Sequence, residues 1–233
     1  MTPPPLRLDN VTLSRGGRTV ARNLSGVFAP GSLTAVTGPN GCGKSTLLQT
    51  LAGVLPLTAG RISHAPDIAL LAQEGRLDRG FPINCRDVVA LGATARLGYF
   101  RDIGGALTGD AQAALDAVGL PGFGDRPIGA LSAGQFQRVL FARALLRDAA
   151  IILLDEPFSA VDAATEAALM DIVHAWHAEG RTVVAVLHDL DLIRAEFPNT
   201  LLLGSDPPIW GPTEQVLPRR RTRERVVNAQ AAA

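Results

Sequence analysis

The sequence predicts an α/β protein whose core is a mainly parallel β-sheet. Short apolar runs of strand length alternate with helix-length segments along the chain, which is typical of parallel sheets covered by helices. A glycine-rich loop, residues 38–46, lies between one such run and a predicted helix. The stretch 81–147 is rich in alanine, leucine and arginine and indicates an inserted, mostly helical subdomain.

The individual elements follow from apolar spacing and from turn residues. Residues 6–30 carry β-branched residues and leucines broken by Gly16-Gly17 and Pro30-Gly31, which predicts strands joined by turns. Further strands are predicted over 33–37, 60–62, 68–72, 150–154, 182–187 and, as the last, 201–203. Helices are predicted over 44–52, 163–179 and 190–196.

Bulk composition excludes several classes of protein. The 233 residues are 47% apolar and carry a formal net charge of zero. A chain of this length can bury one sizeable core, and the lack of a basic excess argues against nucleic acid as a partner. Two cysteines fit a reducing compartment. No signal peptide is visible and no apolar run reaches the ~20 residues of a membrane span, so we expect any work at a membrane to pass through a partner.

The glycine-rich loop has the pattern G-x-x-x-x-G-K-[ST], which binds the phosphates of nucleoside triphosphates. Lys44 is the single lysine among 22 basic side chains, and the other 21 are arginines. A compact ammonium reaches between two phosphates where a planar guanidinium is too bulky. We therefore expect Lys44 to bridge the β- and γ-phosphates and Ser45 to bind Mg²⁺. The loop residues are Gly38, Pro39, Asn40, Gly41, Cys42, Gly43, Lys44, Ser45 and Thr46.

Two acids, Asp155 and Glu156, directly follow the apolar run 151–154. Open α/β sheets bind ligands outside the carboxyl ends of their strands. We expect Asp155 to hold Mg²⁺, directly or through water, and Glu156 to polarise the attacking water as a general base. The alternative is a surface acid pair after a core strand, which the phosphate loop upstream disfavours.

The segment Leu131-Ser132-Ala133-Gly134-Gln135 precedes apolar residues at helical spacing. Gly134 permits close backbone approach, and a helix start is an anion site. Taken by itself, however, Ser132 is better interpreted as the N-cap of an ordinary helix.

The order of these motifs resembles that of the ATP-binding cassette (ABC) ATPases over nearly the whole chain. The phosphate loop is followed by Gln73, by Leu-Ser-Ala-Gly-Gln, by Leu-Leu-Asp-Glu-Pro at 153–157 and by His188. The resemblance implies a P-loop NTPase fold of the ABC type. Its mainly parallel core sheet would carry an N-terminal antiparallel β-subdomain and an inserted helical subdomain.

The resemblance also implies roles for residues. Two copies would form a head-to-tail dimer that encloses two ATP molecules, with each phosphate loop facing Ser132, Ala133, Gly134 and Gln135 of the other copy. Asp162 matches the D-loop of the family. Gln73 matches the glutamine that senses Mg²⁺ and water, and His188 matches the histidine that contacts the γ-phosphate.

The chain departs from the family pattern in two places. Arg15 stands where an aromatic residue usually stacks on adenine, and a guanidinium plane can stack on a purine too. The alternative is a turn arginine that points to water. The only tyrosine, Tyr99, lies in the helical insert. Ala133 replaces the commonest glycine. Cys42 in the phosphate loop is tolerated within the family, and the helix start can activate its thiol.

Within the family, the segments 81–89, 97–100, 188–194 and 197–198 resemble the ATPases of zinc and manganese importers. This implies a bacterial importer with zinc as the first candidate cargo and manganese as the second. The chain would bind integral membrane permease subunits at the cytoplasmic face of the plasma membrane. An extracytoplasmic metal-binding protein would deliver the cargo. Haem, siderophore or cobalamin import stays open, whereas a non-transport ABC ATPase and a non-enzymatic binder are disfavoured.

Two further features have open interpretations. The arginine-rich tail from Pro218 is either a solvated terminus or a contact for anionic lipid or a membrane subunit. His174 and His177 have helical spacing that suits a metal pair, although a solvated helix face is the more common outcome. The expected organisation is one ATPase domain over 1–217, with the helical subdomain at about 81–147, and a tail over 218–233.

Overall fold

The structure is a computed structural model that describes residues 5–63, 67–72, 79–94, 105–159 and 161–218. Gln73, Tyr99 and the arginines from Arg219 onward lie outside the described residues. The strands are β1 (Leu6–Arg15), β2 (Arg18–Phe28), β3 (Leu33–Thr37), β4 (Ala59–Ile62), β5 (Ile68–Leu71), β6 (Ile151–Asp155), β7 (Thr182–Val186), β8 (Asn199–Leu202) and β9 (Ile209–Pro212). The helices are α1 (Lys44–Leu51), α2 (Cys85–Ala90), α4 (Gly105–Ala117), the 3-10 turn η1 (Ile128–Ala130), α5 (Ala133–Arg147), α6 (Ala163–Ala178), α7 (Leu190–Glu196) and α8 (Thr213–Val216).

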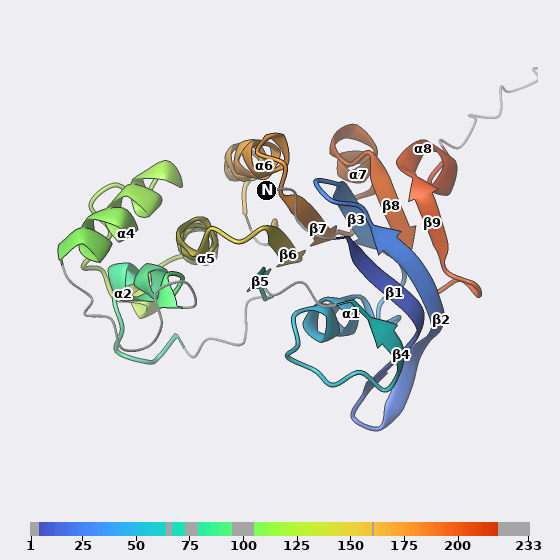
Figure 1. Ribbon diagram of the computed structural model, residues 1–233. Helices are drawn as coiled ribbons and strands as arrows, with labels where there is room; N and C mark the ends of the chain where they lie inside the picture. The colour runs from blue at the N-terminus through green and yellow to red at the C-terminus, as the bar shows by residue number, and fades with distance from the viewer. Residues whose placement is uncertain (1–4, 64–66, 73–78, 95–104, 160, 219–233) are drawn as a thin grey trace, which may run out of the picture.

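Two sheets form the frame of the molecule (Figure 1). The larger sheet has the strand order β5-β6-β7-β3-β8-β9, and its pairs are parallel except for β8 with β9. The smaller sheet is antiparallel, with the order β2-β1-β4. The predicted mainly parallel core with an N-terminal antiparallel subdomain is therefore confirmed.

The central strands of the larger sheet are buried on both faces. Every residue of β3, β6 and β7 is buried. Alternate residues of these strands join two different cores, one on the side of α5 and α6 and one on the side of α1 and the antiparallel sheet. Burial on both faces explains why these segments are continuous apolar runs instead of alternating ones.

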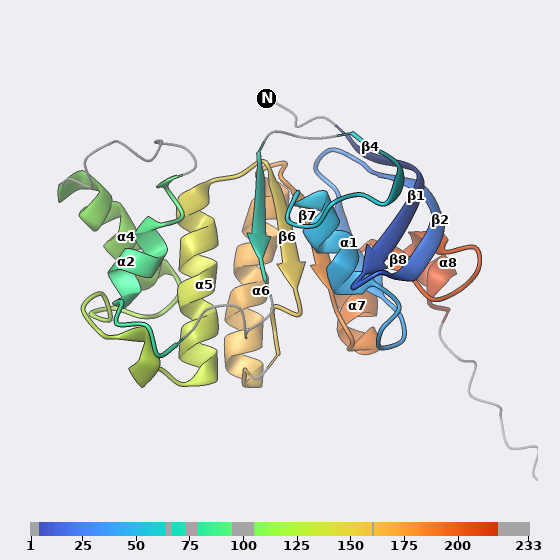
Figure 2. The ribbon, with the colours of Figure 1, turned by 90° about the horizontal axis from the view of Figure 1, so that it is seen from below.

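Helix α1 lies between the two sheets. It packs against β1 on one side and β6 on the other, and all of its residues except Ser45 are buried. Its position follows from the glycine loop, which leads from the end of β3 directly into the helix; Figure 2 shows α1 between β6 and the antiparallel strands β1 and β2.

The inserted segment forms a helical end to the molecule. Helices α2, α4 and α5 pack on one another, and both views show α2 and α4 beyond α5, at the opposite end from the antiparallel sheet. Helix α5 belongs to both parts because its apolar residues share one continuous core with β6 and α6. None of the helices in the described part of the chain has the length and apolar character needed to cross a membrane.

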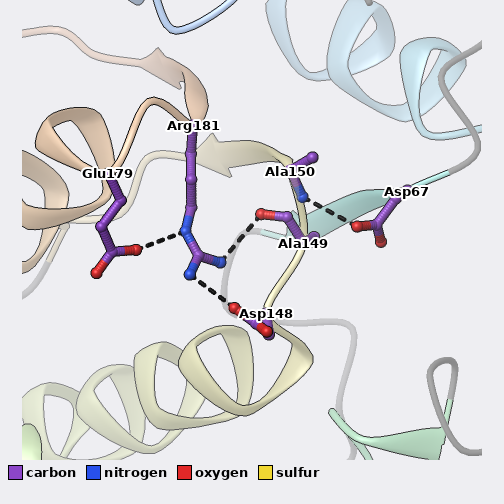
Figure 3. Close-up of polar contacts among 6 residues, drawn as sticks. All are labelled: Asp67, Asp148, Ala149, Ala150, Glu179 and Arg181. Atoms are coloured by element: carbon purple, nitrogen blue, oxygen red, sulfur yellow. Dashed lines mark hydrogen bonds and ion pairs between the residues drawn. The ribbon is translucent and has the colours of Figure 1, made fainter. Parts of the chain in front are cut away.

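A cluster of polar residues connects the amino ends of the neighbouring strands β5, β6 and β7 (Figure 3). Arg181, just before β7, donates to Asp148 at 2.6 Å, to Glu179 at 2.7 Å and to the Ala149 carbonyl at 3.2 Å. Asp67, just before β5, accepts from the Ala150 N–H at 3.0 Å. The cluster lies at the end of the sheet away from the loops that follow β3, β6 and β7.

One expectation about the C-terminal part was wrong. The strand expected at 201–203 is β8, and β9 rather than β8 is the last strand. β9 pairs antiparallel with β8, and Trp210 packs on Phe28 with ring centroids 4.6 Å apart. β9 could not be predicted from the sequence, because its four residues include a glycine and a proline and show no alternation of apolar and polar side chains.

Candidate active site

The candidate site lies at the carboxyl ends of β3, β6 and β7, which are neighbours in the larger sheet. The glycine loop follows β3, Asp155 ends β6 with Glu156 directly after it, and His188 follows β7. Parallel strands bring their carboxyl ends to one edge. Segments separated by more than 100 residues in the sequence therefore meet there, as Ser45 and Asp155 do.

The loop conformation depends on two glycines. Gly38 has φ 143°, and a Cβ there would lie 2.2 Å from the Leu203 carbonyl oxygen. Gly43, the N-cap of α1, has φ 102°, a region that favours glycine. The chain thereby turns tightly enough for the first N–H groups of α1 to face the space above the loop, as anion binding requires.

Lys44 lies at the centre of this loop. It is only 6% exposed, and its ammonium donates to the carbonyl oxygens of Gly38 at 2.8 Å and Pro39 at 3.0 Å. A buried ammonium needs such partners. The loop therefore closes around the one lysine of the chain, as a phosphate-binding loop does.

Ser45 and Asp155 join the loop to the end of β6. The Ser45 hydroxyl donates to Asp155 Oδ1 at 3.0 Å, and Asp155 is 1% exposed. A hydroxyl and a carboxylate are the hard oxygen donors that Mg²⁺ takes together with substrate phosphates. The two residues expected to hold Mg²⁺ thus lie together, and their chemistry fits that ion.

Glu156 and His188 form a second pair across the site. His188 Nε2 and Glu156 Oε1 are 2.9 Å apart. Glu156 has φ 52°, which non-glycine residues rarely adopt. Its N–H donates to the Val186 carbonyl at 3.2 Å, and its carbonyl accepts from the N–H and the hydroxyl of Ser159 at 3.2 and 2.9 Å. These bonds hold the unusual backbone and direct the carboxylate toward the end of β7.

A cavity of about 660 Å³ lies over the loop. Its wall combines the loop, the Glu156–His188 pair and one face of the β1–β2 hairpin: Arg15, Arg18, Val20, Asn40, Gly41, Gly43, Lys44, Ser45, Thr46, Glu156 and His188. The volume suits a small-molecule ligand. The lining does not include Gly38, Pro39, Cys42 or Asp155.

The hairpin residues of the wall were only partly anticipated. Arg15 was a candidate, whereas Arg18 and Val20 were missed. The signal was present, because the two-residue Gly16-Gly17 turn sets Arg15 directly opposite Arg18, and paired residues and every second residue share a face. No aromatic side chain lines the cavity among the residues that the structure describes.

The Ser132–Gln135 turn does not join this cavity. It begins α5 with a reciprocal capping box, in which the Gln135 N–H donates to Ser132 Oγ at 3.2 Å and the Ser132 N–H donates to Gln135 Oε1 at 3.1 Å. Ala133 and Gly134 are half-buried at this helix start. The capping role is therefore real, and it leaves the turn at the surface away from its own chain's phosphate loop.

Asp162 caps the start of α6. Its carboxylate accepts from the Thr165 N–H at 2.8 Å. That hydrogen bond lowers the pKa of Asp162, with smaller contributions from the Thr165 side chain and from Arg138. The carboxylate therefore stays ionised at this helix start.

The histidines of α6 do not form a metal site in the described residues. His174 Nε2 lies 3.1 Å from Glu196 Oε2, and no group of three or more His, Cys, Asp or Glu side chains within the described ranges could hold a metal ion. The metal-pair interpretation of His174 and His177 is therefore dropped.

The glycine loop closes on Lys44, and Glu156 and His188 lie opposite it at the ends of neighbouring strands. This arrangement is that of a P-loop ATPase of the cassette type. Comparison with known proteins agrees: the sequence profile described as "ABC transporter" matches residues 21–159. The chain belongs to the ABC transporter family and is an ATP-binding, ATP-hydrolysing member of it.

Relatives and solved structures give the same result. The chain is 40% identical over 220 residues to the manganese transport system ATP-binding protein MntB of Bacillus subtilis, covering 91% of this chain and 88% of the relative. It is 36% identical over 207 residues to the zinc transport system ATP-binding protein TroB of Treponema pallidum, covering 85% and 78%.

Among solved structures, an inward-facing metal-chelate type ABC transporter matches with a TM-score of 0.81 and 30% identity, covering 91% of this chain and 84% of that one. A dimeric bacterial ABC transporter cassette matches with a TM-score of 0.76 and 26% identity, covering 85% and 94%.

Proposed function

We propose that this chain is the ATPase subunit of an importer for a divalent transition metal, with manganese placed before zinc. The observation that carries the proposal is the cavity over Lys44, in which the Glu156–His188 pair faces the phosphate loop. The manganese and zinc relatives, which align along most of their length, supply the class of cargo. Their order of identity favours manganese over the zinc that the sequence alone suggested.

The chain's own residues have distinct tasks in hydrolysis. The N–H groups of the loop and the start of α1 hold the phosphates, and the Lys44 ammonium exchanges the Gly38 and Pro39 carbonyls for phosphate oxygens. Glu156 accepts the proton of the attacking water as general base. His188 orients the Glu156 carboxylate and contacts the γ-phosphate. Arg15 stacks on the base, and Gln73, outside the described residues, stays the predicted sensor of Mg²⁺ and water.

We propose Ser45 and Asp155 as the chain's Mg²⁺-binding groups. The Ser45 hydroxyl and the buried Asp155 carboxylate are hydrogen-bonded to each other, and both supply the oxygen donors that this ion prefers. The ion would neutralise phosphate charge during the reaction.

A second copy of the chain completes each site in this proposal. The Ser132–Gln135 turn and Asp162 lie at the surface, outside their own cavity, which leaves the turn accessible to the γ-phosphate held by a facing copy. A dimeric cassette among the structural neighbours supports the pairing of two copies. ATP then favours the closed dimer through its higher affinity for that state.

The membrane side of the assembly rests on the family. We propose residues 1–217 as one ATPase domain, with the helical subdomain 81–147 meeting integral membrane permease subunits at the cytoplasmic face. The tail, 218–233, is left without an assigned role. An extracytoplasmic metal-binding protein would supply the cargo, which never contacts this chain.

One observation favours a second cargo class. The structural neighbour with a TM-score of 0.81 is described as a metal-chelate type transporter. A metal bound within an organic chelate is therefore the alternative to the free ion.

A transport assay tests the proposal. Cells that lack this chain are complemented with the wild type or with Lys44→Ala, and uptake of labelled Mn²⁺, Zn²⁺ and a haem or siderophore chelate is measured. We expect Mn²⁺ uptake to be restored by the wild type only. Restored chelate uptake without Mn²⁺ or Zn²⁺ uptake would replace the cargo, and equal uptake with Lys44→Ala would remove ATP hydrolysis as the driving step.

A further inference from the structure

One buried amide connects α5 to the loop that carries Glu156. Gln137 is 2% exposed, and its Nε2 donates to the Pro157 carbonyl at 2.7 Å. Its neighbours on α5, Phe136, Val139 and Phe141, are buried in the apolar core. A polar side chain in such surroundings is destabilising unless it is hydrogen-bonded.

Gln137 is poorly suited to a purely structural role. Its second polar atom, Oε1, is buried and has no hydrogen-bond partner among the residues that the structure describes. A methionine of similar length would remove this unpaired oxygen. The hydrogen bond that the amide does make must therefore account for the residue, and its acceptor is the carbonyl of Pro157, the residue directly after Glu156.

The Pro157 carbonyl is a sensitive point of the site. Glu156 has φ 52°, a conformation that persists only where its surroundings enforce it. Ser159 holds the Glu156 carbonyl, and Gln137 holds the next carbonyl in the chain. Two successive peptide groups are thus fixed, which determines where the Glu156 carboxylate lies relative to His188.

We propose that Gln137 is a positioning residue for hydrolysis, which keeps Glu156 in its productive orientation by holding the Pro157 carbonyl. The proposal rests on the role of Glu156 in the proposed function. Gln137 also lies two positions after Gln135, on the helix that the Ser132–Gln135 turn begins. A shift of α5 when that turn meets the nucleotide of a facing copy would reach Glu156 through this hydrogen bond.

The test separates positioning from folding. Gln137→Met keeps the length and apolar fit of the side chain and removes the donor. We expect kcat for ATP hydrolysis to fall by ~10- to 100-fold, the scale of a misplaced catalytic group, while KM for ATP and the unfolding temperature stay close to wild type. Gln112→Met is the matched control, because Gln112 donates to Asp116 on the same helix α4; its kcat should be unchanged.

A second variant, Gln137→Glu, tests the same hydrogen bond in case Gln137→Met does not fold. In Gln137→Glu the ionised side chain cannot donate, whereas the protonated form can, and burial favours the protonated form. We expect kcat relative to wild type to rise as the pH is lowered from about 8 to about 6, over the range where circular dichroism shows native structure.

The outcomes are distinguishable. Wild-type kcat in Gln137→Met, a raised KM with unchanged kcat, or a pH-independent and normal Gln137→Glu would overturn the positioning role. Glu156→Gln is measured beside them. If that variant hydrolyses ATP at the wild-type rate, the proposed role of Glu156 fails. If it is inactive while Gln137→Met is normal, only the inference about Gln137 fails.

Discussion

Glu156 Oε1 and His188 Nε2 lie 2.9 Å apart although 32 positions separate them in the chain. The contact spans the ends of the neighbouring strands β6 and β7, whose register places Asp155 opposite Val186. Glu156 directly follows β6 and His188 lies two residues beyond the end of β7, so the pairing of these strands sets the separation of the two residues. The pair lines the same cavity as Lys44, so a hydrogen bond between them controls the orientation of the proposed general base.

The first prediction concerns His188. His188→Ala removes the hydrogen bond to Glu156, and we expect ATP hydrolysis to fall by ~100-fold or more, the lower end of the effect of a positioned acid–base group. ATP affinity should change little, because the loop and Lys44 stay intact. His177→Ala, on α6 and away from the cavity, is the control. Steady-state hydrolysis and equilibrium ATP binding report the two quantities, and unimpaired turnover in His188→Ala would contradict the role.

The second prediction concerns the Ser45–Asp155 pair. Asp155→Asn removes the charge without changing the size, and Ser45→Ala removes the hydroxyl that bonds to it. We expect the Mg²⁺ concentration for half-maximal hydrolysis to rise by ~10-fold or more in each variant, as for other lost metal-site groups. Asp67→Asn, at the opposite ends of the strands, is the control. A Mg²⁺ titration that coincides with the wild type would exclude these residues from the metal site.

The third prediction concerns Arg15 and the base. If its guanidinium stacks on adenine, Arg15→Ala should weaken ATP binding about 5-fold, corresponding to ~1 kcal/mol of stacking. Affinity for inorganic triphosphate, which has no base, should not change, and Arg15→Tyr should restore ATP affinity. Arg22→Ala, outside the cavity on β2, is the control. Equal losses for ATP and triphosphate would indicate a charge contact in place of stacking.

The fourth prediction is a pH dependence at Asp162. The hydrogen bond from the Thr165 N–H lowers the pKa of Asp162 in the folded state. Its contribution to stability is therefore fully present above the unfolded-state pKa, about 4, and is lost as the pH falls through the lower folded-state pKa. Asp162→Asn keeps an acceptor for the cap but cannot titrate in this range.

Thermal unfolding of both proteins between neutral and acidic pH checks this. We expect the wild type to lose its advantage over Asp162→Asn progressively below about pH 4. A difference that stays constant across this range would show that the charge of Asp162 does not stabilise the folded state.

The fifth prediction concerns the polar cluster around Arg181 (Figure 3). Arg181→Met should lower the free energy of unfolding by roughly 1–2 kcal/mol, since half-exposed acid partners limit the strength of each contact. The cluster lies at the amino ends of the strands, so kcat of the folded protein should not change. Chemical denaturation and hydrolysis assays measure the two effects. A large loss of kcat without loss of stability would connect this cluster to the site.

Local patterns made most of the fold predictable. The apolar runs at 33–37, 151–154 and 182–186 became buried parallel strands, because burial on both faces leaves a sequence signal within each segment. The loop around Lys44 was recognisable because its conformation depends on glycines at fixed spacing. β9 was not recognisable, since a short edge strand is held by its partner and by Trp210 packing on Phe28.

The candidate site was predictable to the extent that its residues belong to motifs. Arg18 and Val20 belong to none, and they reach the cavity only through the register of the β1–β2 hairpin. Gln137 was likewise absent from the residues that the sequence singled out. Its hydrogen bond to Pro157 exists because α5 packs beside the end of β6. The sequence of neither segment predicts that packing.

The phosphate loop, the strand–helix alternation and the identity of the acids and the histidine are visible in the linear chain, because each depends on residues close together in it. The folded arrangement was needed to show that Ser45 meets Asp155, that Glu156 meets His188, and that the Ser132–Gln135 turn lies outside its own cavity. Those relations depend on strand order and helix packing. The free energy that fixes them is shared among distant segments, so no single stretch of sequence carries it.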